Sequence, residues 1–331
     1  MKAKTVQDSG ERGLIELIRK AFPARGKNVF LGIGDDAAVL RPGRKPTILT
    51  KDLLVEDVDF LRDRHPAFFI GRKSLSVNLS DIAAMGGTPR AALLGLGLPG
   101  DLPLDWIRAF LKGFAAAGRD YGTDLIGGDI SKSREIVISV TLVGEGEPLV
   151  TRSGARPGDG VYVSGTLGDA ALGFDLIKSG ASIAARGAKA AVVRAFLNPQ
   201  PQLALGRELA RRRLASAMID LSDGLSVDLG HLAGESGVGA EIETAALPLS
   251  AGMRAWGGKD SLRYALHGGE DFQLLFTVRR SRGNEAALAA LARRYPLRKI
   301  GRIVGKKGIF IVAEAGRRTP LPARGYEHFK A

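Results

Sequence analysis

Residues 144–160 read GEGEPLVTRSGARPGDG, and this stretch determines how the chain is divided. Its glycines and prolines favour turns and interrupt both helices and strands. A chain of 331 residues is also long enough for two domains of ordinary size. The sequence therefore predicts a first domain over residues 1–148 and a second over residues 149–331.

Both halves combine segments of helical and of strand-like periodicity. We expect helices over residues 11–22, 67–85, 104–121, 169–179, 202–213, 225–236 and 285–295. We expect strands over residues 29–33, 37–40, 46–54, 55–60, 90–98, 135–143, 161–164, 217–219, 273–278 and 309–312. This order of elements predicts a fold of the α/β and α+β classes.

Composition excludes several classes of protein. There is no cysteine, so disulfides and thiolate metal sites are excluded. The apolar stretches are too short to cross a bilayer, and residues 1–12 lack the apolar core of a signal peptide. We therefore expect a cytoplasmic protein that makes no use of a membrane.

Positive charge is concentrated in the second half of the chain. Residues 1–150 carry a net charge of +2 (21 basic, 19 acidic), and residues 151–331 carry +11 (27 basic, 16 acidic). We interpret this charge mainly as a solvated basic face, with attraction of an anionic substrate as an alternative. Nucleic-acid binding is a further alternative, which the aromatic content of 6% disfavours because few rings are available for base stacking.

Aspartates recur at turns that are rich in glycine or lie at strand ends. The instances are GDD (34–36), TKD (50–52), LSD (79–81), GGD (127–129), DLSDG (220–224) and GGED (268–271). Each alone is typical of a turn or helix cap. Gathered in one crevice, however, the carboxylates would repel one another unless hard cations such as Mg²⁺ lay between them. Neighbouring glycines would let backbone N–H groups approach phosphate oxygens, so the pattern indicates Mg²⁺–nucleotide chemistry. The chain has no P-loop motif.

Seven strings that run in order along nearly the whole chain resemble the thiamine-monophosphate kinases of the PurM-like superfamily. They are GIGDDAAVL (32–40), VNLSDIAAMGGTP (77–89), LIGGDISKS (125–133), TRSGARPGDGVYVSGTLGDA (151–170), IDLSDGLSVDLGHLA (219–233), ALHGGEDFQLLFTV (265–278) and GYEHF (325–329). The resemblance implies a PurM-like two-domain fold. Its N-terminal domain would contribute strands to a barrel shared by two copies, its C-terminal domain would be α+β, and the protein would be a homodimer.

The resemblance also implies a reaction in which ATP phosphorylates thiamine monophosphate to thiamine diphosphate by direct in-line transfer. No general base is assigned, because the attacking phosphate oxygen is already ionised near neutral pH. By the same resemblance, several Mg²⁺ ions would be held by Asp36, Thr50, Asp52, Asp81, Asp129, Asp220 and Asp223. ATP would contact Gly128, Asp129, Arg152 and Ser222, and the thiamine end would contact Glu270 and Tyr326.

Three positions depart from the family pattern. Lys51 stands where a hydroxyl residue is usual, and it would either replace one metal ion or contact a phosphate. Asp59 replaces a histidine that touches substrate, and Lys112 lies near the place of a tyrosine that stacks on adenine. These departures leave open another PurM-like ATP-dependent enzyme with a different acceptor. The basic second half leaves open a non-catalytic binder of nucleotide or nucleic acid.

Overall fold

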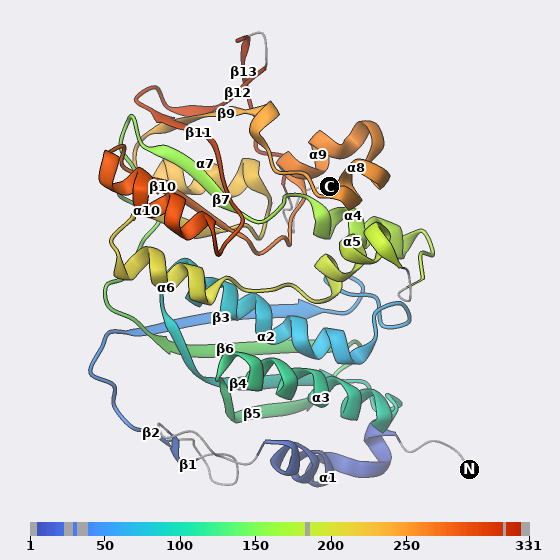
Figure 1. Ribbon diagram of the computed structural model, residues 1–331. Coiled ribbons are helices and arrows are strands. Elements are labelled where there is room, and N and C mark those ends of the chain that lie inside the picture. The colour runs from blue at the N-terminus through green and yellow to red at the C-terminus, as the bar shows by residue number, and fades with distance from the viewer. Residues whose placement is uncertain (1–4, 23–28, 32–38, 183–185, 314–315, 326–331) are drawn as a thin grey trace. The chain divides into compact units, whose positions relative to one another are not determined.

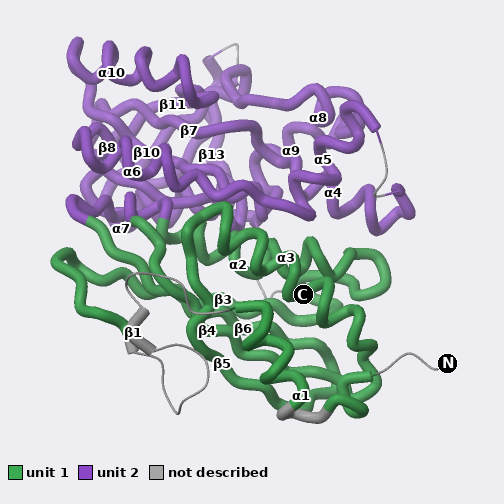
Figure 2. The backbone as a smooth tube through the Cα atoms, turned by 60° about the horizontal axis from the view of Figure 1, so that its bottom comes forward, with its two compact units in different colours: residues 1–82, 88–146 green, residues 83–87, 147–331 purple. Residues whose placement is uncertain are grey.

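The computed structural model describes the chain except for residues 1–4, 23–28, 32–38, 183–185, 314–315 and 326–331 (Figure 1). It divides into two compact units, coloured separately in Figure 2. Unit 1 comprises residues 1–82 and 88–146, and unit 2 comprises residues 83–87 and 147–331. The division after Gly146 falls inside the stretch rich in glycine and proline.

Unit 1 is built on a four-stranded sheet in the order β3-β6-β4-β5 (Figure 1). The strands are β3 (Thr47–Val55), β4 (Thr88–Leu98), β5 (Asp124–Lys132) and β6 (Val137–Glu145). The pair β4–β5 is parallel and the other two pairs are antiparallel. The helices are α1 (Val6–Ala21), α2 (Ala67–Ala84) and α3 (Leu104–Tyr121), and β1 (Val29–Leu31) pairs with β2 (Val39–Leu40).

The prediction of a strand over residues 55–60 is wrong, because the chain turns there. The carboxylate of Asp59 accepts the backbone N–H of Val55 at 2.8 Å, and Asp57 has a positive φ of 65°. A short acidic side chain that bonds backbone four residues away competes with the ladder of a strand. Strand β3 therefore ends at Val55.

Two glycines let helices α2 and α3 cross at backbone contact. A Cβ atom added to Gly113 would lie 1.8 Å from the carbonyl oxygen of Phe68, and one added to Gly71 would lie 2.0 Å from that of Phe110. Real Cβ atoms do not approach backbone this closely, so any larger residue would force the helices apart. The pairing of α2 with α3 thus depends on glycine at both positions.

We expect Gly113→Ala to destabilise the protein by about 3 kcal/mol, because separating two packed helices opens cavities along their contact. Gly230→Ala is the matched control: it also places alanine inside a helix, but nothing lies within 4 Å of the added Cβ. There we expect no loss and up to about 1 kcal/mol of gain from helix propensity. Urea unfolding of the two variants measures the difference, and equal stabilities would contradict this account of the crossing.

Unit 2 contains a seven-stranded sheet in the order β13-β12-β9-β11-β7-β10-β8. Its strands are β7 (Gly160–Ser164), β8 (Ala215–Asp220), β9 (Gly239–Glu243), β10 (Leu274–Val278), β11 (Leu297–Val304), β12 (Gly308–Val312) and β13 (Arg318–Pro320). Its helices are α4 (Asp169–Lys178), α5 (Gly187–Leu197), α6 (Leu203–Arg211), α7 (Leu225–Glu235), α8 (Ala251–Trp256), α9 (Ser261–His267) and α10 (Arg282–Ala292). Sequence periodicity missed α5, α8, α9, β9, β11 and β13.

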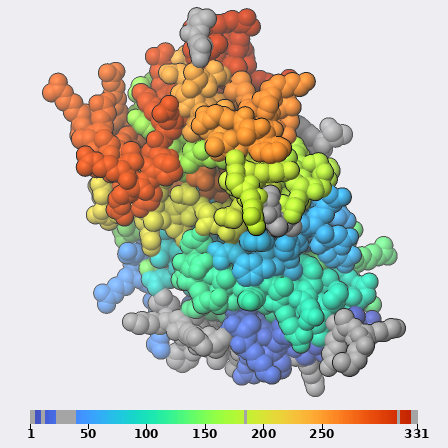
Figure 3. Space-filling model, turned by 45° about the vertical axis from the view of Figure 1, so that its right-hand side comes forward, coloured from blue at the N-terminus to red at the C-terminus, as the bar shows by residue number. Residues whose placement is uncertain are grey.

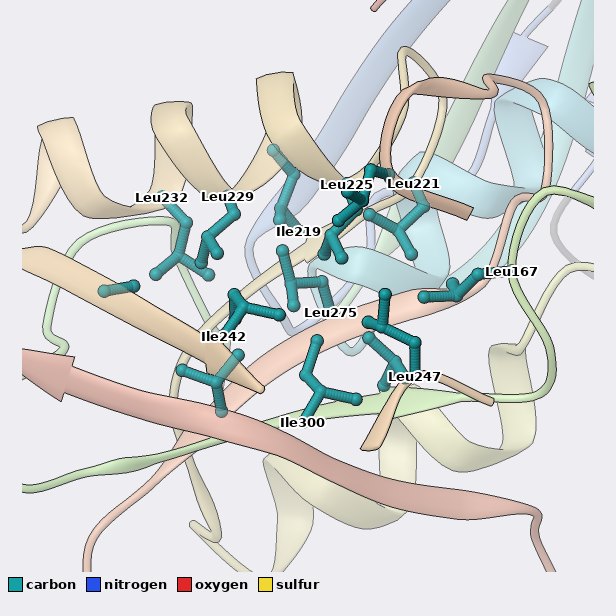
Figure 4. Packing of buried hydrophobic residues seen from close by; sticks show 14 of the residues in the cluster. Leu167, Ile219, Leu221, Leu225, Leu229, Leu232, Ile242, Leu247, Leu275 and Ile300 are labelled. Atoms are coloured by element: carbon teal, nitrogen blue, oxygen red, sulfur yellow. The ribbon is translucent and has the colours of Figure 1, made fainter. Parts of the chain in front are cut away.

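The main core of unit 2 lies between the sheet and helix α7. Leu225, Leu229 and Leu232 of α7 point toward Ile219, Leu275 and Ile300 of the strands (Figure 4). Their spacing of three and four residues places the leucines on one face of the helix. Because α7 begins directly after β8, this packing also holds the loop between them, residues 221–224.

No described helix of either unit is both long and apolar enough to span a membrane.

Candidate active site

In unit 1, strand β3 and helix α2 bring together three of the predicted metal-binding residues. Alternation along β3 puts Thr50 and Asp52 on the same face of the strand. The Thr50 hydroxyl donates a hydrogen bond to the carboxylate of Asp81, in the last turns of α2. Thr50, Asp52 and Asp81 therefore form one acidic group, although 31 residues separate Thr50 from Asp81 in sequence.

The electrostatics of this acidic group fit a cation. The pKa of Asp52 is raised from 3.8 to about 7, first by burial and then by the like charges of Asp81 and Asp59. Its buried Oδ2 has no hydrogen-bond partner among the described residues. A buried carboxylate oxygen without a donor, beside a second carboxylate, is the arrangement that a divalent cation would stabilise.

Over the described part of the chain, no three acidic or histidine side chains form a ready-made metal cluster. This agrees with the usual chemistry of Mg²⁺, which keeps several waters and takes one or two carboxylates together with substrate phosphates. Two neighbouring carboxylates such as Asp52 and Asp81 match that number. Asp36, a further predicted ligand, lies outside the described residues.

The side chain of Lys51 lies on the opposite face of β3 from these carboxylates. Its ammonium group donates to the hydroxyl of Ser139 on β6, and the residue is exposed. Since neighbours in a strand point to opposite faces, Lys51 and Asp52 are directed apart. The side chain of Lys51 therefore lies on the opposite face of the sheet from Thr50 and Asp52.

The remaining predicted residues of unit 1 lie on separate elements. Asp59 closes the turn after β3 and adds negative charge near Asp52. Asp129 is exposed on β5, an outer strand of the sheet, and the strand register puts it on the face of Lys51, opposite Asp52. Gly128 passes so close to β4 that an added Cβ would lie 1.9 Å from the carbonyl oxygen of Leu94. Lys112 is exposed on α3, and no contact of a described residue joins it to the acidic group.

In unit 2, Asp220 and Asp223 lie at the end of β8 and in the loop that follows it. Asp220 is buried, with 3% of its surface exposed. Asp228, in the first turn of α7, accepts the backbone N–H of Asp223 at 3.1 Å and that of Gly224 at 3.0 Å. Burial, followed by the like charges of Asp220 and Asp223, raises the pKa of Asp228 to about 8.

Sequence analysis missed Asp228. Its position five residues after Asp223 was the available signal, because an acidic residue in the first turn of a helix can accept N–H groups from the loop that leads into that helix. The carboxyl group of Asp228 shapes the loop that carries Asp223, so it is a positioning residue for the acidic pair of unit 2.

The GGED loop lies against the same turn. The backbone N–H of Glu270 donates to the carbonyl oxygen of Ser222 at 2.8 Å, so the predicted thiamine-binding and nucleotide-binding residues are neighbours. Glu270 has a positive φ of 68°. For a residue other than glycine, that strained backbone is more common at functional sites than elsewhere.

Asp271 explains how this strained loop is held in place. Its carboxylate accepts the N–H groups of Gly168 at 2.5 Å and Ala170 at 3.1 Å, at the beginning of helix α4. Burial raises the pKa of Asp271 to about 7. Because a buried carboxyl bonded to a helix N-terminus is costly to move, it fixes Glu270 beside Ser222.

Two further predicted site residues remain, Arg152 and Tyr326, and among the described residues no side-chain contact ties Arg152 to these loops. Arg152 is exposed, and its carbonyl oxygen accepts the hydroxyl of Ser236 at 3.1 Å, which fixes the backbone and leaves the guanidinium in solvent. Tyr326 lies outside the described residues.

These features define the class of protein to which the chain belongs. Residues 34–145 match the model of the AIR synthase related protein N-terminal domain, and residues 156–314 match that of the C-terminal domain. The chain is therefore a two-domain AIR synthase related protein with the PurM-like fold.

Similar sequences narrow the class further. A thiamine-monophosphate kinase of Aquifex aeolicus is 38% identical over 327 residues, which cover 98% of this chain and 99% of that protein. The Escherichia coli K12 enzyme of the same name is 38% identical over 330 residues, covering 97% of this chain and 98% of that protein. The chain belongs to the thiamine-monophosphate kinase family.

Solved structures support the same assignment. A thiamine-monophosphate kinase from Stenotrophomonas maltophilia K279a superposes with a TM-score of 0.81 at 40% identity, covering 90% of this chain and 95% of that one. AaThiL complexed with AMPPCP and TMP superposes with a TM-score of 0.78 at 37% identity, covering 99% of this chain and 100% of that one.

Proposed function

We propose that this protein transfers the γ-phosphoryl group of ATP to thiamine monophosphate, giving ADP and thiamine diphosphate. The observation that carries the proposal is the full-length similarity to thiamine-monophosphate kinases, joined to an acidic group in each unit. The structural relative AaThiL is complexed with AMPPCP and TMP, a pair of ligands that matches this reaction.

The chemistry requires positioning more than proton transfer. An oxygen of the acceptor phosphate forms a bond to the γ-phosphorus as the bond to the β,γ-bridging oxygen breaks, and ADP leaves. The attacking oxygen is already ionised, so no side chain has to remove a proton. Bound Mg²⁺ would supply neutralisation of the negative charge on the phosphates.

We assign the protein's share of this chemistry by unit. In unit 1, Thr50, Asp52, Asp81 and Asp129 would bind Mg²⁺, together with Asp36. In unit 2, Asp220 and Asp223 would do so, with Asp228 holding their loop. Gly128, Arg152 and Ser222 would contact ATP, and Glu270 and Tyr326 would contact the thiamine end. We place the boundary between the two functional domains at residues 148 and 149, between the two matched family models.

Asp59 bears on the choice of acceptor, because it is one of the departures from the family pattern. Its carboxylate bonds backbone in the turn after β3, which explains its presence there without a role in catalysis. The direct test of the acceptor is a product assay with Mg-ATP, in which thiamine monophosphate, thiamine and pyridoxal phosphate are offered in parallel. We expect a phosphorylated product from thiamine monophosphate alone.

We also propose that the protein is a homodimer, on the evidence of one sheet face of unit 1. Leu49 and Leu53 on β3 and Leu93 on β4 are 68%, 53% and 38% exposed. The strand register aligns Leu93 and Lys51 with Thr141, so these residues share a face. Three exposed leucines on one sheet face, beside polar residues, are typical of an interface, and we assign a second copy of the chain as its occupant.

The double variant Leu49→Glu/Leu53→Glu is expected to be a monomer, because it places like charges in the centre of the proposed interface. Sedimentation equilibrium measures the mass directly. Leu262→Glu is the control, since Leu262 is also exposed, at 41%, but lies on α9 of unit 2. A wild-type protein that sediments as a monomer of 35.0 kDa would contradict the proposal.

A further inference from the structure

Most of the chain's net charge comes from one segment that the proposed function does not use. Residues 279–307 contain ten lysines and arginines and a single acidic residue, Glu285. The net charge of this segment is therefore +9, and the net charge of the whole protein is +13. The segment comprises helix α10, strand β11 and the chain on either side of them.

Six of these cations are exposed at the ends of helix α10 and on strand β11, which follows it in the sequence. This α10 basic surface consists of Arg279, Arg280, Arg282, Arg293, Arg294 and Lys299. Figure 3 shows the segment, in orange-red, with long side chains that extend outward from the body of the protein. Helix α10 buries Leu288 and Leu291, so its opposite side faces solvent.

Helical geometry places cations at both ends of that solvent-facing side. Arg282 and Arg293 are 11 residues apart, which is about three turns, so they point in nearly the same direction about 16 Å apart. Between them the exposed residues are one carboxylate and several small residues, which leave the helix open to close approach: Glu285, Gly283, Ala286, Ala289, Ala290 and Ala292. The result is a shallow surface with a cation at each end.

Within the described part of the chain, no carboxylate forms a salt bridge with the α10 basic surface. Arg211 and Arg212 of α6 bond Glu208, and Arg302 and Arg318 bond Glu241. By contrast, none of the six cations forms an ion pair with a described residue. Arg279, Arg280 and Arg282 also lie at the N-terminal end of α10, where the helix dipole is positive and a cation is unfavourable. Such a concentration of like charge costs stability unless an anion binds it.

We propose that the α10 basic surface binds the phosphate backbone of double-stranded nucleic acid without sequence preference. Five of its six cations are arginines, whose planar guanidinium matches the geometry of phosphate oxygens. A duplex carries one negative charge per about 1.7 Å of axis, so a span of about 16 Å faces on the order of nine phosphates. From sequence, the positive charge of the second half is interpreted mainly as a solvated face, with nucleic-acid binding as an alternative. The proposal selects that alternative for the α10 basic surface.

An anionic membrane is the less favoured ligand for a physical reason. Helices that bind bilayer surfaces insert large apolar side chains between the headgroups. The large exposed apolar residues among those described are Ile15, Leu49, Leu53, Val58, Leu93, Leu149, Trp256 and Leu262, and none belongs to residues 279–307. The exposed side of α10 instead carries alanines and Glu285, with arginines at its two ends, which suits contact by charge and not by insertion.

The test measures binding of the full-length protein to a labelled 20-base-pair DNA of mixed sequence by fluorescence anisotropy from 50 to 200 mM salt. The variant is Arg282→Gln/Arg293→Gln/Arg294→Gln. The control is Arg207→Gln/Arg211→Gln/Arg212→Gln at α6. It also removes three positive charges, but Arg211 and Arg212 already form ion pairs with Glu208. A parallel arm replaces DNA with vesicles of anionic phospholipid.

We expect the variant to lose at least tenfold in affinity at 100 mM salt, and the slope of log K against log salt to decrease by about 2.7, or 0.9 for each lost phosphate contact. The control should change affinity by less than about twofold. Equal losses in variant and control would overturn the proposal, since net charge alone would then explain binding. Binding to vesicles alone, or to neither ligand, would also overturn it. Kinase turnover and melting temperature are measured for the variant and for the control, to check that each is folded.

Discussion

The variant Asp81→Asn is expected to lose phosphoryl transfer almost completely while remaining folded. Asparagine has nearly the same shape, and its amide oxygen can still accept the hydrogen bond from Thr50. What it lacks is the negative charge that would bind Mg²⁺ beside Asp52. Metal ions contribute several kcal/mol to phosphoryl transfer, so we expect kcat to decrease by about a thousandfold or more.

Asp129→Asn on β5 should have a comparable effect, because Asp129 is assigned to the same chemistry on a different element. The control is Asp105→Asn, which alters an exposed carboxylate that pairs with Arg108 on α3. Coupled-enzyme detection of ADP measures turnover, and thermal unfolding reports the fold. If Asp81→Asn retained more than a tenth of wild-type turnover, the assignment of the metal-binding group in unit 1 would be wrong.

The variant Asp228→Ala is expected to lower kcat/KM by about a hundredfold, although Asp228 is assigned no contact with substrate. Its carboxyl accepts the N–H groups of Asp223 and Gly224, and alanine would leave both donors without this acceptor. The loop that carries Asp223 and Ser222 would then lose its defined shape. Unmet hydrogen bonds of this kind also cost about 1–3 kcal/mol of stability.

Asp228→Asn distinguishes positioning from a role that needs the charge. The amide oxygen accepts hydrogen bonds, so we expect this variant to recover most of the activity that alanine loses. Asp175→Ala is a suitable control, because its carboxylate bonds the Tyr264 hydroxyl at an exposed place on α4. Equal losses in the Asn and Ala variants of Asp228 would show that its charge, and not its hydrogen bonds, is required.

Local sequence pattern was sufficient where structure is local. Alternation over residues 135–143 predicted β6, which the structure has at Val137–Glu145. The spacing of Thr50 and Asp52, two residues apart in a strand, is enough to put them on one face. The same alternation puts Lys51 on the other face of β3, whereas the family pattern treats Lys51 as a neighbour of the metal-binding residues. The strand expected over residues 55–60 failed because Asp59 forms a side-chain bond that periodicity does not report.

The arrangement of the candidate site depended on contacts distant in sequence. Nothing in the local pattern shows that Thr50 bonds Asp81, or that Glu270 lies beside Ser222. The short helices α8 and α9, of six and seven residues, are below the length at which periodicity is informative. What the sequence could supply was the set of acidic turns; tertiary packing decided which of them meet.

The central claim is that this chain transfers a phosphoryl group from ATP to the phosphate of thiamine monophosphate. The most direct measurement incubates the purified protein with Mg²⁺, γ-labelled ATP and thiamine monophosphate, and follows the label by chromatography. We expect the label in the terminal phosphate of thiamine diphosphate, with one ADP formed for each product molecule. Label that appears only as inorganic phosphate, or stays in ATP while the protein is folded, would contradict the account.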